Sequence, residues 1–185
     1  AAPVAAAPAP AATAFDIDAD FDKVAAAQTA GWGIDIKLDR ERLRIGKDRV
    51  SFSIRSLQDG LVYVFSHGND GSLQQLYPNG LTPAPRIAKG GTMRLPQGNL
   101  EFNVDGPAGV TKLLVLVSRW PRDHNAFSPK VESGFTSFPT GPDAAKLAAA
   151  NPGPLPLIAG RAICPSGQAC ADEFGAATAR FEVTP

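Results

Sequence analysis

The sequence predicts a mainly β protein in which short antiparallel strands form a β-sandwich. Apolar and polar residues alternate through much of residues 32–119, as in strands with one buried face. The short sequences Asp-Gly and Asn-Asp-Gly occur between these segments, as in tight hairpin turns. Many short strands with frequent turns are typical of the immunoglobulin-like sandwich, which we expect here with one or two short peripheral helices.

Residues 1–14 differ in composition from the rest of the chain. This Ala/Pro run cannot bury a core and is typical of a semi-extended spacer, so we expect a linker or stalk, or else a frayed end without a role. Because the chain begins with Ala, we expect a removed leader or a larger parent chain, and the linker favours the latter. Residues 15–185 then form a single β-sandwich domain with a loop-rich, disulfide-stapled C-terminal segment.

The first predicted element is a short helix over residues 19–29, because Phe21 and Val24 follow helical spacing. The alternation of Asp with apolar residues over 15–22 also fits a strand. Its four Asp residues suggest calcium, but the sixth and twelfth positions counted from Asp16 are not the Gly and Glu of an EF-hand, so we expect no metal site. Candidate helix caps are Asp18 or Asp20 at the start and Gly31 at the end.

Central strands follow in order. Residues 32–38 alternate, 43–46 form a short edge, and 49–56 place Val50, Phe52 and Ile54 on one face. Asp59-Gly60 and Asn69-Asp70-Gly71 then predict two turns. We therefore expect an antiparallel meander of three successive strands, which are 49–56, 61–67 and 72–77.

The later strands are shorter or more deeply buried. Residues 90–96 and 100–104 predict two short strands, and the continuous apolar run of 112–119 predicts a strand buried on both faces. Prolines break the remainder into loops. A helix over 143–151 and a last strand over 179–184 complete the prediction.

Cys164 and Cys170 are the two cysteines of the chain. Their separation across a Pro-Ser-Gly turn predicts a disulfide, which would imply an oxidising compartment. Free thiols and a metal or redox site are weaker alternatives, because Cys-X-X-Cys spacing and paired His ligands are missing from the sequence.

No catalytic residue is predicted. Ser66, His67 and Asp70 crowd one hairpin, yet adjacent strand residues point to opposite faces, so a triad there is not expected. Sequence motifs for nucleophile elbows and phosphate loops are also missing. We expect no cofactor.

Loop aromatics are the candidate binding surface. Trp120, Phe127, Phe135 and Phe138 lie where few strands are predicted, so they either contact a glycan, peptide or protein partner or anchor the loops from below. Lys and Arg balance Asp and Glu at 18 each, which argues against nucleic acid and against adhesion to lipid.

Several strings together resemble a bacterial domain family of unknown function over about residues 15–183. Members of that family lie at the extracytoplasmic C-terminus of transmembrane serine/threonine kinases and in envelope lipoproteins, some encoded near type VI secretion systems. The strings are LRIG (43–46), VSFSIRS (50–56), DGLVYVF (59–65), DGSLQQLYPN (70–79), LP (95–96), GPAG (106–109), LVLVSRWPRD (114–123) and the tail CPSGQACADEFGAATARFEV (164–183).

The resemblance implies a kinase and a membrane helix before Ala1, and it assigns no catalytic residues. We expect a non-enzymatic periplasmic sensor or protein-interaction domain, tethered to the inner membrane in the full-length protein, with a protein or envelope ligand as partner and a homodimer as one mode of action. The alternatives are a structural component of the envelope or of a secretion system and, less favoured, an envelope hydrolase.

Overall fold

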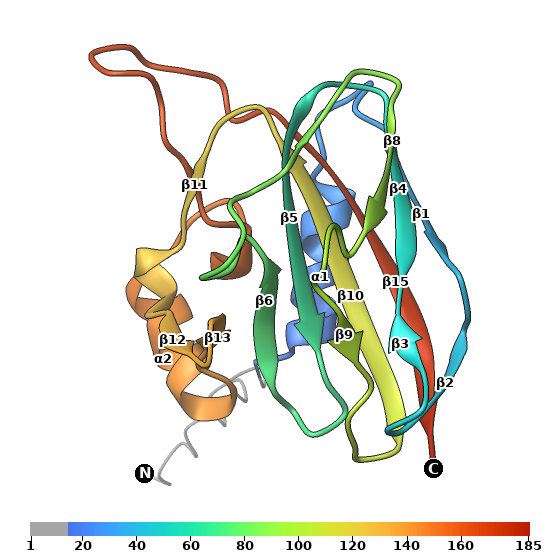
Figure 1. The fold of residues 1–185 in the computed structure, drawn as a ribbon. Helices are drawn as coiled ribbons and strands as arrows, with labels where there is room; N and C mark the ends of the chain where they lie inside the picture. Colours follow the sequence, from blue (N-terminus) through green and yellow to red (C-terminus); the bar gives the residue numbers. More distant parts are fainter. Residues whose placement is uncertain (1–14) are drawn as a thin grey trace, which may run out of the picture.

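The computed structural model describes residues 15–185, so the expected linker over 1–14 lies outside the described residues. The fold is mainly β, with about 40% strand and 15% helix, as the sequence predicts. Two α-helices, α1 (Ile17–Ala26) and α2 (Gly141–Ala150), lie on the same side of the largest sheet (Figure 1).

A small antiparallel sheet forms one layer. Its three strands run in the order β1 (Ile34–Leu38), β4 (Phe52–Ser56) and β8 (Thr92–Leu95). Ile36 lies opposite Ile54, and Ile54 lies opposite Met93, so apolar residues share the inner face.

A larger sheet of eight strands forms the second layer, and its pairs are antiparallel except for parallel β15 and β2. Short two-stranded pairs and two 3₁₀ helices fill the remainder. The order of the large sheet is β12 (Lys130–Glu132), β13 (Phe135–Phe138), β6 (Leu73–Tyr77), β5 (Gly60–His67), β10 (Gly109–Ser118), β15 (Phe174–Thr184) and β2 (Arg42–Arg44), with β7 (Arg86–Ile87) beside β5. The short pairs are β3 (Arg49–Val50) with β9 (Phe102–Asn103) and β11 (Arg122–Asp123) with β14 (Arg161–Ala162), and the 3₁₀ helices are η1 (Asn125–Phe127) and η2 (Leu157–Ala159).

Two apolar cores lie on the two faces of the large sheet. The first core packs the inner face of the small sheet against it, with Phe52, Ile54 and Leu113 among its buried members. The second core packs α1, α2 and the 3₁₀ helices against its other face. The chain therefore has a third, helical layer beyond the two sheets, and the immunoglobulin-like arrangement itself stays a prediction.

Strand β10 is buried on both faces, which confirms the prediction from its apolar run. The last strand also returns to the sheet as predicted, although β15 is longer than expected and begins at Phe174. On β3 and β4, Val50, Phe52 and Ile54 are all buried. The predicted strand 49–56 is in fact two strands, β3 and β4, in different sheets, and the short strands β11 to β14 lie where loops were expected. Alternation and continuous apolar runs thus located the longer strands only.

The three-strand meander is wrong, because β4 and β5 lie in different sheets. The predicted hairpin of the second and third strands is correct, since β5 and β6 pair across a turn in which Gly71 has φ +81°. Gly60 does not have the positive φ expected of a hairpin. A Cβ atom there would lie 2.8 Å from the carbonyl oxygen of Ser118, so the glycine permits β10 to approach while the chain crosses between sheets.

Helix α1 starts and ends earlier than predicted. Asp16, rather than Asp18 or Asp20, is the N-cap, and its carboxylate accepts a hydrogen bond from the backbone N–H of Ala19 at 3.1 Å. The C-cap is Ala27 rather than Gly31. Asp18 instead points to the sheet, where basic side chains contact it.

Candidate functional site

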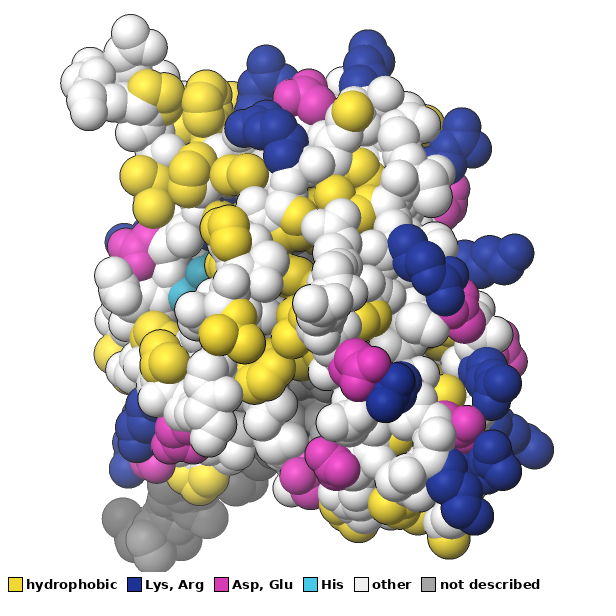
Figure 2. Space-filling model, in the orientation of Figure 1, with side chains coloured by type: hydrophobic (Ala, Val, Ile, Leu, Met, Phe, Trp, Pro, Cys, Tyr) yellow, Lys and Arg dark blue, Asp and Glu magenta, His cyan; other side chains and the backbone are white. Residues whose placement is uncertain are grey.

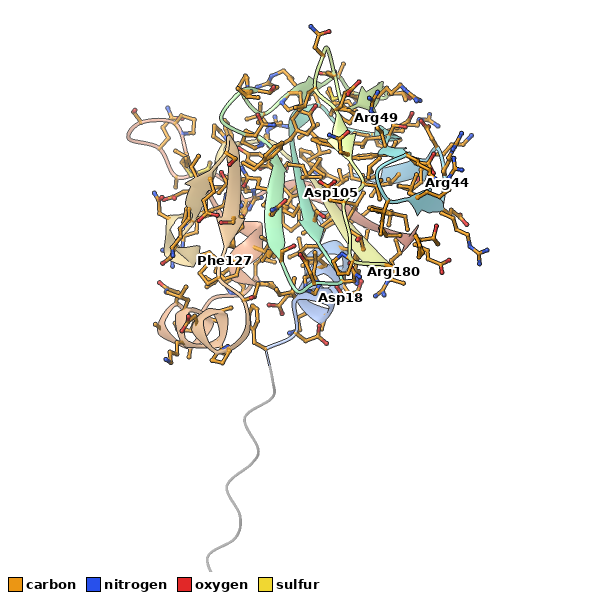
Figure 3. All side chains as sticks on the ribbon, turned by 60° about the horizontal axis from the view of Figure 1, so that its bottom comes forward. Asp18, Arg44, Arg49, Asp105, Phe127 and Arg180 are labelled. Atoms are coloured by element: carbon orange, nitrogen blue, oxygen red, sulfur yellow. A yellow bond between two sulfur atoms is a disulfide. The ribbon has the colours of Figure 1, made fainter. Side chains whose placement is uncertain are left out.

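Three basic residues lie in one row across the large sheet, under α1. His67 on β5 is the register partner of Lys112 on β10, and Lys112 is the partner of Arg180 on β15. Figure 3 shows Asp18 of α1 beside Arg180 at this end of the sheet. A cross-strand row of basic groups therefore faces the acidic first turns of the helix.

Lys112 is the most buried of these groups, with 2% of its side chain exposed. Its Nζ donates to the carbonyl oxygen of Asp18 at 2.8 Å and to Oδ1 of Asp22 at 2.6 Å. The Asp18 carboxylate lies 2.8 Å from Nδ1 of His67 and 3.4 Å from the guanidinium of Arg180. These contacts fix the position of α1 on the sheet, in addition to the apolar contacts of Ile17, Phe21 and Val24.

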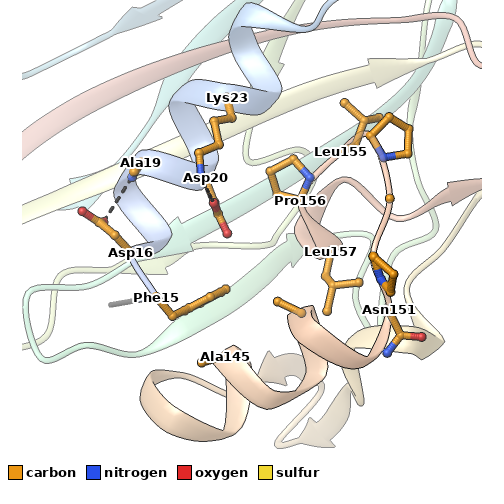
Figure 4. Close-up of a pocket in the computed structure, with 14 residues that line it drawn as sticks. Phe15, Asp16, Ala19, Asp20, Lys23, Ala145, Asn151, Leu155, Pro156 and Leu157 are labelled. Carbon is orange, nitrogen blue, oxygen red and sulfur yellow. Dashed lines mark hydrogen bonds and ion pairs between the residues drawn. The ribbon is translucent and has the colours of Figure 1, made fainter. Parts of the chain in front are cut away.

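An open groove of about 610 Å³ lies between the first turns of α1, helix α2 and the segment that follows α2 (Figure 4). Apolar side chains form most of its walls, and the ring of Phe15 lies between the two helices. Asp20 and Lys23 form an ion pair of 2.9 Å at its α1 side. The wall residues used below are Phe15, Asp20, Lys23, Ala145, Ala148 and the stretch 151–157.

The stretch 151–157 is a proline ridge with the sequence NPGPLPL. Pro152, Gly153 and Pro154 are exposed, whereas Leu155 and Leu157 are half-buried. Pro156 has φ −54° and ψ 149°, close to polyproline II geometry. The backbone bends at Asn151, Pro154 and Leu155, and Leu157 begins η2, so this extended geometry is shown for Pro156 alone.

A second hollow of about 240 Å³ lies on the other side of the proline ridge. His124, Gly160 and the disulfide partners Cys164 and Cys170 are among its lining residues. A Cβ at Gly160 would lie 2.8 Å from Nε2 of His124, so only glycine permits this close approach. The proline ridge therefore separates two hollows. One flank of the ridge faces the groove, and the other flank faces the second hollow.

Burial lowers the pKa of His124 to about 4. Its Nε2 lies 3.1 Å from the carbonyl oxygen of Ile158, and its ring lies between the aromatic rings of Tyr63, Phe65 and Phe138. The side chain is thus neutral at pH 7. It positions η2 at the end of the proline ridge.

Arg122 is fully buried behind the second hollow. Its guanidinium donates to Oγ of Ser118 at 2.9 Å and to the carboxylate of Asp172, and it lies 4.9 Å from the ring centroid of Phe174. Burial lowers the pKa of this arginine, and Asp172 opposes that change. The side chain connects the end of β10 to η2 and to the start of β15, so the hollow has a rigid base.

The small-sheet side of the molecule carries most of the visible Lys and Arg side chains, with acidic groups between them (Figure 2). Arg44 lowers the pKa of Asp48 to about 2, chiefly by hydrogen bonding to it. Most arginines of this side lie in ion pairs, although Arg40 and Arg44 share one carboxylate and Arg55 of β4 is in none of the ion pairs of residues 15–185, so the side is not a uniform field for a polyanion. The pairs are Arg40 and Arg44 with Asp48, Arg42 with Glu182, Arg49 with Glu101, and Arg94 with Asp39.

The structure contains the disulfide between Cys164 and Cys170, with a Cα to Cα distance of 5.5 Å. Of the four candidate aromatics, Phe127 and Phe138 are 1% and 6% exposed and stack on each other in the second core. They anchor η1 and the end of β13 and offer no exposed ring to a ligand. Phe135 is half-buried against the first core, and the half-buried Trp120 donates through Nε1 to the carbonyl oxygen of Ala171 at 3.0 Å.

The crowded hairpin does not assemble a triad. His67 faces Asp18, while the carboxylate of Asp70 accepts hydrogen bonds from Ser72. Within residues 15–185, no three His, Cys, Asp or Glu side chains gather as metal ligands. Neither described helix has the length and apolar character needed to cross a bilayer.

Residues 42–121 match the model of a family described as a domain of unknown function, DUF4384. No curated protein and no solved structure matches the chain. The matched residues run from β2 to the end of β10, whereas the residues that line the two hollows all lie outside them. The sequence contains a signal for the proline ridge, namely prolines at 152, 154 and 156, but the same prolines also predict an ordinary loop.

Proposed function

We propose that the chain is a non-enzymatic recognition module of the bacterial cell envelope, which binds a protein partner at the groove beside α1. One observation carries this proposal: the groove is built from the first turns of α1, the helix that directly follows residues 1–14. A partner in the groove therefore contacts the element next to the predicted linker. Such an arrangement suits a sensor domain.

The walls of the groove suit apolar side chains of a partner. Phe15, Ala145, Leu155 and Leu157 supply apolar surface, and the Asp20–Lys23 ion pair supplies polar contacts at the rim. Protein interfaces combine an apolar centre with a polar rim in this way. The disulfide supports an oxidising compartment, in which we place the module.

Signal transfer would use the attachment of α1 to the sheet. A ligand shifts a conformational equilibrium only by its difference in affinity for two states. A partner in the groove would contact α1, which Lys112, His67 and Arg180 hold against the sheet. We propose that partner binding changes these contacts and thereby moves α1 and the N-terminal linker. In the full-length protein, a membrane serine/threonine kinase would receive the signal.

A site-specific crosslinking experiment tests the binding surface. A photoreactive amino acid replaces Ala148 in the groove or, as a control, Thr92 on the exposed outer face of the small sheet, in cells that produce the full-length protein. We expect an adduct with one protein from position 148 and none from 92. The adduct should disappear when Ala145→Trp fills the groove. Equal adducts from both positions, or none from 148, would refute the proposal.

A structural envelope role is the second candidate, supported by a different surface. Leu81 and Val131 are 76% and 70% exposed, and Leu81 lies beside Gly134 at the turn between β12 and β13. Strand β12 is also an edge of the large sheet, so it can pair with another chain. This role predicts that a photoreactive group at Val131, rather than Ala148, gives the adduct.

The kinase association has its own test. The full-length reading frame should encode a kinase domain and a membrane-spanning helix before Ala1. A reading frame that begins with a lipoprotein signal instead would favour the structural role.

A further inference from the structure

We infer that the second hollow binds a small neutral molecule that has one apolar ring and a hydroxyl or N–H donor, and that Nδ1 of His124 accepts the hydrogen bond from this donor. The site goes beyond the proposed function, because it lies on the opposite flank of the proline ridge from the partner groove. A concave, mainly apolar hollow with few polar groups is typical of small-molecule sites.

The walls and the size of the second hollow suit one ring. Its lining includes Ala126, Leu155, Ala162 and the disulfide between Cys164 and Cys170. The volume of about 240 Å³ is smaller than that of sites for drug-sized ligands, so a single ring with one substituent fits better than a larger compound. Contact with these side chains would remove the apolar surface of the ring from water, which favours binding.

The charged groups at the second hollow balance one another. Asp172, on its lining, pairs with the buried guanidinium of Arg122 behind it. Arg161 and Asp123 are register partners on β14 and β11, and both also line the hollow. Because two basic groups face two acidic groups, the hollow has no surplus of either charge, and a charged ligand would lose its hydration without gaining a free counterion. The balance therefore favours a neutral ligand.

His124 supplies a hydrogen-bond acceptor that the protein itself does not use. Its Nε2 must carry the proton, because it lies 3.1 Å from the carbonyl oxygen of Ile158, which can only accept. The neutral ring then has a lone pair on Nδ1, and none of the hydrogen bonds of residues 15–185 uses that atom. No buried side-chain nitrogen or oxygen in this part of the chain lacks a partner, so Nδ1 is accessible to solvent. Since His124 lines the second hollow and not the groove, we place this acceptor at the second hollow.

Contacts across the chain hold the frame of the second hollow. Strand β11 pairs with β14, and the backbone N–H of Ile163 donates to the carbonyl oxygen of Pro121 at 2.8 Å. The close approach of Gly160 to His124 fixes the position of the imidazole ring. Because this frame exists before binding, a ligand orders few side chains when it enters.

A ligand series tests the site on this chain, with backbone amide NMR shifts as the readout. Phenol should shift the amide signals of Ala126, Gly160 and Ala162 in a saturable way, with a Kd of about 1 mM. Anisole, in which a methyl group replaces the hydroxyl proton, should bind about five- to tenfold more weakly. Benzoate, which is charged, should also bind more weakly than phenol. An absence of saturable shifts with phenol, or equal affinities for phenol and either analogue, would overturn the inference.

Two substitutions test whether phenol binds in the second hollow. Ala162→Trp adds a large side chain to its lining and should abolish the shifts, whereas Ala88→Trp, at an exposed alanine that lines neither hollow, should retain them. His124→Phe keeps a ring but removes the acceptor, so phenol and anisole should bind this variant equally. Should His124→Phe fail to fold, the preference of the wild type for phenol decides the role of His124. Unchanged binding in Ala162→Trp, or a retained preference for phenol in His124→Phe, would overturn the inference.

Discussion

The two faces of the large sheet have different chemistry. The face toward the small sheet is covered by strands, and its core is formed by aliphatic and aromatic side chains. The face toward the helices also has an apolar core, but Lys112, Arg122 and His124 lie within this layer and the two hollows open from it. A mainly apolar interface between sheets provides stability, whereas polar groups held by helices and loops can recognise and respond.

The residues that match the family model belong mostly to the first core and not to the helical layer. Residues 42–121 supply most of the first core, which is completed by Trp32, Ile34, Phe181 and Val183. The helices and the proline ridge lie outside the match. The scaffold and the candidate site are thus separate parts of the chain, so the matched segment does not identify the ligand.

The largest effect is expected from neighbouring leucines on β10 that point into opposite cores. Leu113 and Leu114 are 1% and 0% exposed. We expect Leu113→Ala to lower the free energy of unfolding by about 3–5 kcal/mol and Leu114→Ala by about 2–4 kcal/mol, because loops can settle into a cavity more readily than paired strands. Urea denaturation measures both. A larger loss for Leu114→Ala would show that the helical layer is the more rigid one.

The pH dependence of stability should come partly from His124. Burial holds its folded pKa at about 4, below the ordinary value of 6.5. As the pH falls below about 6.5, the unfolded chain therefore binds a proton before the folded chain does. We expect its contribution to be complete above pH 6.5 and to decrease by about 2 kcal/mol between pH 7 and pH 5. In urea denaturation at several pH values, His124→Phe should remove this contribution to the dependence of the unfolding free energy on pH. An unchanged dependence in the variant would contradict the burial of His124.

The attachment of α1 should depend on the partner of the buried lysine. Asp22→Asn keeps an oxygen acceptor for the Lys112 ammonium but removes the negative charge that neutralises it, so we expect a loss of about 1–2 kcal/mol. Lys112→Met keeps the volume and removes the charge, so its cost should be below about 1 kcal/mol. Hydrogen exchange of the α1 amides measures the local effect. Equal losses in the two variants would contradict a role for the unpaired charge.

A similarly small effect should follow reduction of the disulfide. Closing so short a loop contributes about 2–2.5 kcal/mol in the chain-entropy model, and residues 165–169 are all exposed, so local strain and fraying should lower that figure. We expect a loss of about 1–2 kcal/mol in the free energy of unfolding, with faster amide exchange confined to the second hollow. Cys164→Ser with Cys170→Ser should reproduce it. Unchanged stability would remove the main support for an extracytoplasmic location.

Local patterns predicted the parts of the fold that depend on neighbouring residues. Val50, Phe52 and Ile54 alternate because a strand places successive side chains on opposite faces. The meander was wrong because the same alternation fits a strand in either sheet, and Gly60 serves the approach of β10 rather than a hairpin. The buried aromatics Phe127 and Phe138 could not be separated from surface aromatics, since η1 and β13 are too short to show a hydrophobic period.

The sequence by itself determined the mainly β class, the doubly buried strand β10, the disulfide partners and the prolines of the ridge, because each depends on residue type and short spacing. Only the tertiary structure decided which charged side chains meet and where the groove and the second hollow lie. It brought Lys112 of β10 to Asp22 of α1, 90 positions earlier in the chain, and it set the proline ridge between two hollows. Such contacts depend on which strands pair and on which helix covers them. Equal numbers of acidic and basic residues in the composition do not determine the strand pairing or the position of the helix.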